Sequence, residues 1–112
     1  MHEMSIAVGL IDLAEEQARA ANAGHINSLE VEIGALAGIE THSLSFCYET
    51  ARRDTMCEQA QLIITELPGR GHCPACDTET DVDFFVALCP ECNGGLEIRQ
   101  GRELRLRSLN VD

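Results

Sequence analysis

Apolar residues recur at steps of three and four along the first part of the chain, as they do on one face of an α-helix. This spacing predicts a helix over residues 5–23, ended by Gly24. After it, the apolar residues Leu29, Val31 and Ile33 alternate with polar ones. Such alternation predicts a strand that is buried on one face only.

A second helix and two further strands follow from the same reasoning. Thr41 can cap a helix that runs to about Arg53. Phe46 falls opposite the apolar face of this helix, which predicts burial on both of its sides. The segment AQLIITEL at 60–67 is typical of a strand, and RELRLRSLNV at 102–111 alternates in a similar way.

The order helix, strand, helix, strand, cysteine-bearing segment, strand is typical of an α+β protein. We expect a small two-layer domain, a three-stranded sheet with two helices, formed by residues 1–68 and 98–112. The sequence PGRG at 68–71 interrupts the pattern. Residues 69–97 are expected to form an inserted zinc-ribbon-like module.

Composition and charge narrow the class of protein. Apolar residues make up 45% of the 112 residues, which indicates a globular chain. The chain carries 19 acidic and 8 basic residues, a net charge of −11, whereas nucleic-acid-binding proteins usually carry a basic face. The sequence therefore argues against nucleic acid as a partner. It contains no apolar run long enough for a membrane span and no signal peptide, so we expect a cytoplasmic protein.

Two Cys-x-x-Cys pairs, CPAC and CPEC, are separated by twelve residues. Each pair can direct two sulfurs at one cation, and four thiolates complete a tetrahedral site with no open position. The spacing favours structural zinc, with a hairpin between the two pairs. The predicted ligands are Cys73, Cys76, Cys89 and Cys92. Iron in a rubredoxin-like site, redox dithiols and disulfides stay open as alternatives.

Three other side chains could bind metal or react, but the sequence gives them no firm role. Cys47 is expected to pack as a small apolar residue on the second helix. Cys57 is expected to be a partly exposed thiol in a loop. His72 comes just before the first cysteine pair, where we expect a solvated turn histidine; a spare ligand that replaces a thiolate in acid is the alternative.

The first five residues, MHEMS, place a metal-binding side chain next to the amine of the chain. A large second residue generally blocks removal of the initiator methionine, so Met1 is expected to keep its free amine. This amine, the His2 backbone nitrogen and the His2 imidazole can close chelate rings on one ion, and the Glu3 backbone nitrogen can add a fourth donor. Loss of an amide proton near neutral pH needs a strong planar field, which Cu(II) and Ni(II) provide. A surface histidine without a function is the alternative.

Several segments taken together resemble one family. They are MHEMS, VEIGALAGIE at 31–40, SLSFCYE at 43–49, the two cysteine pairs and GRELRLRSLNV at 101–111. In this combination the chain resembles the HypA/HybF family, whose members insert nickel during the maturation of [NiFe] hydrogenases. The resemblance runs along the whole chain, in order and with similar gaps.

The resemblance implies a set of metals, ligands and partners. Ni(II) would be bound at Met1, His2 and Glu3, with Glu40 as a further ligand or an orienting group, and structural Zn(II) would be bound at the four paired cysteines. It implies two partners, a HypB-type GTPase and the hydrogenase large subunit. We expect a monomer or a weak homodimer.

Two other classes of function stay open at the level of the sequence. One is a zinc-ribbon module that binds another protein and has no role with nickel. The other is a small electron-transfer protein with iron at the four sulfurs. The sequence shows no activated nucleophile, paired carboxylates or phosphate-binding loop, so we predict that the chain is not an enzyme.

Overall fold

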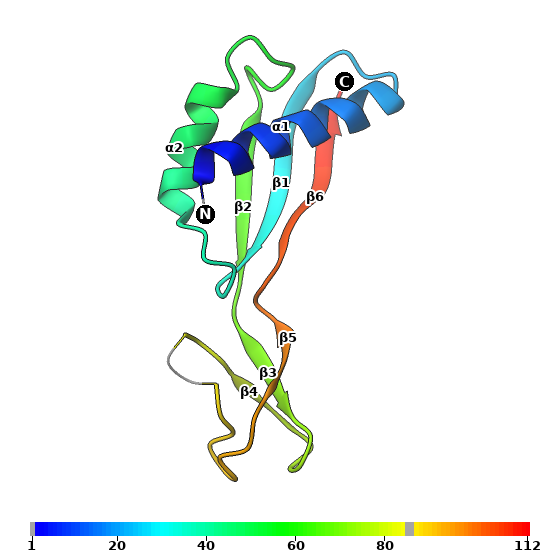
Figure 1. Cartoon of the computed structure of the whole chain (residues 1–112). Helices are drawn as coiled ribbons and strands as arrows, with labels where there is room; N and C mark the ends of the chain where they lie inside the picture. Colours follow the sequence, from blue (N-terminus) through cyan, green and yellow to red (C-terminus); the bar gives the residue numbers. More distant parts are fainter. Residues whose placement is uncertain (1, 85–86) are drawn as a thin grey trace. The chain divides into compact units, whose positions relative to one another are not determined.

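The computed structural model describes residues 2–84 and 87–112, which form two compact units. The second unit consists of Ile33–Gly38 and Glu66–Leu104, and the rest of the described chain forms the first. Figure 1 shows the first unit as two helices with a sheet of long strands, and the second as a sheet of short strands. The short stretch 33–38 therefore belongs with the cysteine-bearing segment.

Helix α1 extends over Glu3–Ala20, close to its predicted place. Its buried residues recur at steps of three and four and are Ala7, Leu10, Ile11, Ala14 and Ala18. The helix ends with Asn22 in the left-handed conformation, at a φ of 58°, while the Ala23 N–H donates to the Ala18 carbonyl at 2.9 Å. Asparagine tolerates this conformation better than most residues, so Asn22 rather than Gly24 ends the helix.

The sheet of the first unit has the strand order β2-β1-β6. Its strands are β1 (Ile26–Gly34), β2 (Gln61–Leu67) and β6 (Leu104–Val111). The central strand β1 confirms the predicted alternation, because Leu29 and Val31 are fully buried. Figure 1 shows α1 lying across this sheet, which accounts for the burial of one sheet face.

The opposite face of β1 carries carboxylates that pair with arginines of β6. Glu32 accepts a hydrogen bond from Arg105 at 2.6 Å, and Glu30 accepts one from Arg107 at 3.2 Å. Exposed pairs of this kind contribute little to the free energy of folding. They do fix the alternation of β1, since a shift of one residue would bring these charges into the core.

Helix α2 extends over Thr41–Ala51 and packs against α1. Leu44 and Tyr48 are its buried residues, whereas the side chain of Phe46 is 76% exposed. The prediction that this helix is buried on two sides is therefore wrong. Leu44 and Tyr48 are one helical turn apart and share one face, and Phe46 lies between them in sequence on the other face.

The connection from α2 to β2 folds back onto the helix. The Tyr48 hydroxyl and the Arg52 guanidinium both donate hydrogen bonds to the Ala60 carbonyl, at 2.8 and 2.9 Å. This connection covers Cys57, which is fully buried, so the prediction of a partly exposed thiol is wrong. Burial raises the pKa of Cys57. Cys57 is therefore a packing residue, and a thiol buried in this way is inert.

The second unit contains a sheet that the sequence did not predict. Its strands β3 (Arg70–Cys73), β4 (Thr78–Asp81) and β5 (Glu97–Gln100) are antiparallel, in the order β4-β3-β5. Strand β4 pairs with β3 across the first cysteine pair, with Cys73 opposite Thr78. The expected hairpin between the two cysteine pairs is therefore wrong.

Three glycines lie where segments of the second unit cross at close range. A Cβ atom on Gly34 would stand 2.0 Å from the Gly101 carbonyl oxygen, and one on Gly69 would stand 2.1 Å from the Val82 carbonyl oxygen. Gly101 itself has a φ of 126°, which strongly favours glycine. The Leu36 N–H donates to the Gly101 carbonyl at 2.6 Å. The predicted interruption at PGRG is confirmed, because β2 ends at Leu67 and β3 begins at Arg70, and Gly69 also permits the close packing at this point.

The predicted fold class is confirmed: an α+β protein with two helices, a three-stranded sheet and a separate cysteine module. In the described part of the chain, no helix has the length and apolar character needed to cross a bilayer.

Candidate metal centres

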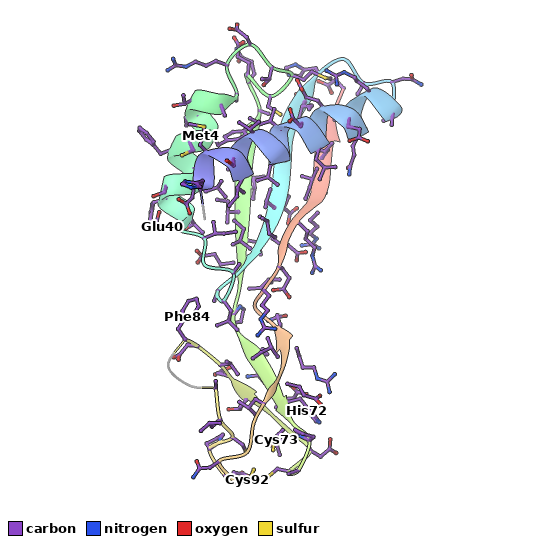
Figure 2. All side chains as sticks on the ribbon, viewed as in Figure 1. Met4, Glu40, His72, Cys73, Phe84 and Cys92 are labelled. Carbon is purple, nitrogen blue, oxygen red and sulfur yellow. The ribbon has the colours of Figure 1, made fainter. Side chains whose placement is uncertain are left out.

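The fold brings the four paired cysteines together at one end of the second unit. Their Sγ atoms all lie within 4.8 Å of one another, and the Sγ atoms of Cys73 and Cys92 are 3.5 Å apart. Figure 2 labels these two residues, which approach each other from different segments. Among the described residues, no other group of three or more histidine, cysteine or acidic side chains could hold a metal ion.

Both cysteine pairs form the same turn. The Asp77 N–H donates to the Cys73 carbonyl and the Asn93 N–H donates to the Cys89 carbonyl, each at 2.8 Å. Asp77 and Asn93 have φ values of 54° and 58°. Aspartate and asparagine enter this left-handed region more readily than other residues with a side chain.

The two turns are therefore equivalent, although no glycine directly follows Cys76. A backbone amide also approaches one sulfur in each turn. The Cys76 N–H lies 3.4 Å from the Cys73 sulfur, and the Gly94 N–H lies 3.3 Å from the Cys92 sulfur. Amides of this kind stabilise thiolates, which are the form that binds metal.

The chemistry of the cluster fits zinc. Cys73 and Cys89 are each 1% exposed, and all four donors are sulfur atoms, so the donor set is closed. Hydrogen bonds from the backbone N–H groups of Cys92 and Glu91 lower the pKa of Cys89 to about 7. These amide hydrogen bonds favour the thiolate form of Cys89, which is the form that binds metal.

His72 lies in strand β3 rather than in a turn. Its side chain is 17% exposed, so the expectation of a solvated turn histidine is wrong. The two ring nitrogens face two carboxylates, with Nδ1 at 3.0 Å from Glu79 and Nε2 at 3.4 Å from Asp77. The neighbouring Cys73 points to the other face of the strand. In this structure His72 therefore braces the first cysteine turn through Asp77.

Two of the predicted nickel ligands, His2 and Glu3, lie at the start of α1. Met1 lies outside the described residues. His2 is exposed and precedes the first helical residue, with φ and ψ of −91° and 110°. The Ile6 N–H donates to the His2 carbonyl at 3.2 Å, which begins the helical hydrogen-bond series. Among the described residues, nothing bonds to the His2 imidazole, and the Glu3 N–H is one of the amides that a helix leaves unbonded.

Glu40, rather than Thr41 as predicted, is the N-terminal capping residue of α2. Its carboxylate accepts a hydrogen bond from the Ser43 N–H. This bond and a second one from the Ser43 side chain lower the pKa of Glu40. Glutamate is not among the preferred capping residues, so propensity alone misses this role. Among the described residues, neither Glu40 nor Glu3 lies in a group with His2 that could hold a metal ion.

Comparisons with known proteins agree over the whole chain. Residues 1–111 match the family model described as "Hydrogenase/urease nickel incorporation, metallochaperone, hypA". The hydrogenase maturation factor HypA of Azotobacter vinelandii is 44% identical over the full length of both chains. The protein of the same name from Chlorobium luteolum is 43% identical, over all of this chain and 97% of the relative.

A solved structure shares the fold. The solution structure of the Ni metallochaperone HypA from Helicobacter pylori is 30% identical, with a TM-score of 0.73, over 99% of this chain and 97% of that one. The names describe a metallochaperone, a protein that carries a metal ion, and not an enzyme, as the sequence predicted. The chain belongs to the HypA family of nickel-incorporation metallochaperones that act in hydrogenase maturation.

Proposed function

We propose that this chain binds Ni(II) through the Met1 amine, the His2 imidazole and backbone nitrogens at His2 and Glu3, and passes the ion to the hydrogenase large subunit. The observation that carries the proposal is the state of His2. Its imidazole is exposed and has no hydrogen-bond partner among the described residues. In a nickel-incorporation family, a free imidazole beside free backbone amides is a ready set of nitrogen donors.

The charge at the start of α1 favours donors that are themselves anionic. The amino end of a helix carries a partial positive charge, which disfavours a bare cation. Two deprotonated amides would cancel the charge of Ni(II), whereas neutral donors alone would leave a divalent ion at this end of the helix. The helix dipole therefore supports coordination through backbone nitrogens, which Ni(II) can deprotonate and zinc cannot.

Binding through both backbone nitrogens requires a local change at His2. A five-membered chelate ring through the nitrogens of His2 and Glu3 needs a nearly eclipsed torsion about the Cα–C bond of His2. That torsion, ψ, is 110° here, so the bond must rotate when nickel binds. Rotation also moves the His2 carbonyl, which accepts the first helical hydrogen bond from Ile6. Nickel loading is thus coupled to the first turn of α1.

Glu40 is proposed as a positioning residue rather than as a main nickel ligand. One of its carboxylate oxygens already accepts the Ser43 N–H, and ligation through that oxygen would uncap α2. The same residue keeps its negative charge at neutral pH because its pKa is lowered. Figure 1 shows the start of α1 beside α2, so a carboxylate that orders α2 also orders the surface next to the nickel donors.

We propose structural Zn(II) at the four cysteines. The described part of Glu66–Leu104 buries few large apolar side chains, since its buried hydrophobic residues are Cys73, Val82 and Cys89. A unit with so small a core needs another source of folding free energy. Zinc bound by four thiolates supplies it, and its closed donor set leaves no position for chemistry.

The proposed partners are a HypB-type GTPase, which exchanges nickel with this chain, and the hydrogenase large subunit, which receives it in the cytoplasm. A site at the chain end suits such exchange. Docking can change the donors of His2 and its neighbours while the core of the first unit, fully buried at Leu29 and Leu44, stays intact. Protonation of the amine and imidazole also releases the ion, so affinity for nickel should fall with falling pH.

The proposal is tested by His2→Ala with His25→Ala as the matched control. His25 is also exposed but lies beyond the other end of α1. Calorimetric titration of zinc-loaded protein with Ni(II) should show one site in wild type and in His25→Ala, and none in His2→Ala. Zinc content should stay at one per chain in all three. Equal nickel affinity in His2→Ala would refute the site and favour a zinc module that only binds proteins.

A further inference from the structure

The second unit carries two adjoining hollows that the nickel and zinc sites do not use. Their volumes are about 230 and 240 Å³, and they share Ile98 and Arg102 in their walls. Every lining residue lies in Ile33–Gly38 or Glu66–Leu104. The pair is therefore a feature of this unit alone.

Most of the residues that line one hollow are apolar, beside Asp83 and Arg102. Its walls include Leu36, Phe84, Ala87 and Ile98, and Phe84 is 68% exposed. Figure 2 shows the Phe84 side chain at the edge of the second unit. Large exposed apolar side chains that line a hollow are typical of a binding site rather than of a solvated surface.

The wall at Leu36 is fixed by the backbone around it. The Leu36 N–H donates to the Gly101 carbonyl at 2.6 Å. The Leu36 side chain packs so close to Gly101 and Gly69 that a Cβ on either glycine would come within 3.1 Å of the leucine Cδ1 atom. The apolar hollow is thus formed before any ligand arrives, which lowers the entropic cost of binding.

The other hollow is cationic, with Arg99 and Arg102 in its wall. Six of the eight arginines of the chain contact a carboxylate. Within the described chain, the Arg102 guanidinium has neither a hydrogen bond nor an ion pair, and Arg53 is the only other arginine in this state. Arg102 lines both of these hollows, and Arg53 lines neither of them.

The acidic groups near Arg102 are engaged elsewhere. Glu103 accepts the Gly101 N–H at 2.8 Å, and Glu97 pairs with Arg99 at 3.0 Å. Asp83 lines the apolar hollow and has a contact of its own. Although the chain has a net charge of −11, the Arg102 guanidinium can therefore bind an anion. It lies beside the apolar residues Leu36 and Ile98 in the wall of the same hollow.

We propose that the two hollows bind a peptide segment of another protein in which a carboxylate side chain follows a large apolar one. The apolar side chain enters the hollow walled by Leu36 and Ile98, and the carboxylate pairs with Arg102. The guanidinium fork matches a carboxylate in two parallel hydrogen bonds. Nucleic acid fits poorly, because its many phosphates would face the −11 charge of the whole chain.

The test uses the full-length, zinc-loaded protein, labelled with ¹⁵N and free of nickel. The probe is the peptide acetyl-Ala-Leu-Glu-Ala-amide, with acetyl-Ala-Leu-Gln-Ala-amide as its neutral match. The first peptide should shift the amide signals of Leu36, Ile98 and Arg102, and the second should bind about tenfold more weakly, as loss of a charge-assisted hydrogen bond predicts. Arg102→Gln should remove this preference, and Arg53→Gln should preserve it.

Four results would overturn the proposal. They are no shift at the hollows, equal binding of the two peptides, an equal effect of Arg102→Gln and Arg53→Gln, and equal shifts with acetate alone, which would mark a simple anion site. Arg102 is exposed, so its replacement should leave the amide spectrum of the rest of the chain unchanged. Because nickel is absent from the test, its outcome is independent of the proposed nickel site.

Discussion

Replacing Gly34 with alanine probes the crossing that holds the second unit together. The new Cβ would stand 2.0 Å from the Gly101 carbonyl oxygen and 2.6 Å from the Arg102 nitrogen. Non-bonded heavy atoms need about 3.5 Å, so the crossing segments must separate by about an ångström or more. All the clashing atoms belong to the backbone, so no side chain can simply rotate away.

The cost follows from the hydrogen bonds across this gap. The Leu36 N–H donates to Gly101 at 2.6 Å, and the Gly34 N–H donates to Glu103 at 2.8 Å. Hydrogen bonds weaken steeply as such distances lengthen, and a buried group left without a partner costs about 1–3 kcal/mol. Loss of both bonds gives about 2–6 kcal/mol, which corresponds to a fall in Tm of about 8–25 °C.

Thermal unfolding of the zinc-loaded variants, followed by circular dichroism, measures this effect. Gly9→Ala is the matched control. Gly9 lies in α1, and a Cβ there would have no heavy atom within 4 Å. Alanine is favoured over glycine in a helix by about 1 kcal/mol, so Gly9→Ala should raise Tm. A folded Gly34→Ala protein that melts at the wild-type temperature would refute the reasoning about the crossing.

Three further predictions concern capping, the cysteine turns and zinc. The pKa of Glu40 is lowered from its usual 4.5, so its charge stabilises the fold above that pH, and the effect is lost as pH falls through the lowered pKa. The difference in Tm between wild type and Glu40→Gln should therefore be present at pH 7 and vanish in acid. A difference that persists in acid would contradict this. Asn93 has a φ of 58°, so Asn93→Ala should speed zinc transfer to a chelator by about threefold to tenfold while Asn93→Gly does not; equal rates would count against a left-handed Asn93. Complete removal of zinc should disorder β3, β4 and β5 and leave α1 folded, as seen in amide spectra, and retention of the β3 signals would exclude a structural role for zinc.

The parts of the fold that the sequence predicted are those with a clear periodic pattern. In β1, Leu29 and Val31 alternate with polar residues because only one face of the sheet is buried. The order of apolar and polar residues therefore shows this burial directly. The second sheet lacks such a pattern. Its strands have four residues each and bury little beyond Cys73. The convergence of the cysteines and close backbone contacts at Gly69, rather than side-chain periodicity, accompany these strands.

The same contrast holds for the candidate sites. The spacing of the cysteines predicted their convergence, because each Cys-x-x-Cys pair can direct two sulfurs at one ion and two pairs complete a tetrahedral site. The left-handed conformations of Asp77 and Asn93 were not predicted, because glycine is the usual residue in this region. Asp and Asn after a Cys-x-x-Cys pair could have signalled the turn. The cap at Glu40 depends on where the preceding loop places its carboxylate, which no local preference encodes.

The central claim, nickel bound by the amine of the chain, can be tested by acetylating that amine. The chain contains no lysine, so a reagent specific for aliphatic amines modifies only the amine of Met1, and every residue stays in place. A tag is a poorer test, since a single added residue would place histidine third and create a different planar nickel site.

Zinc-loaded protein with a free or an acetylated amine should therefore be titrated with Ni(II) by calorimetry. We expect one nickel per chain for the free amine and an affinity lower by about 100-fold or more after acetylation. The amide signal of Ile6 should also shift on loading, because the His2 carbonyl that accepts its hydrogen bond rotates. Equal nickel affinity for the two forms would contradict the account.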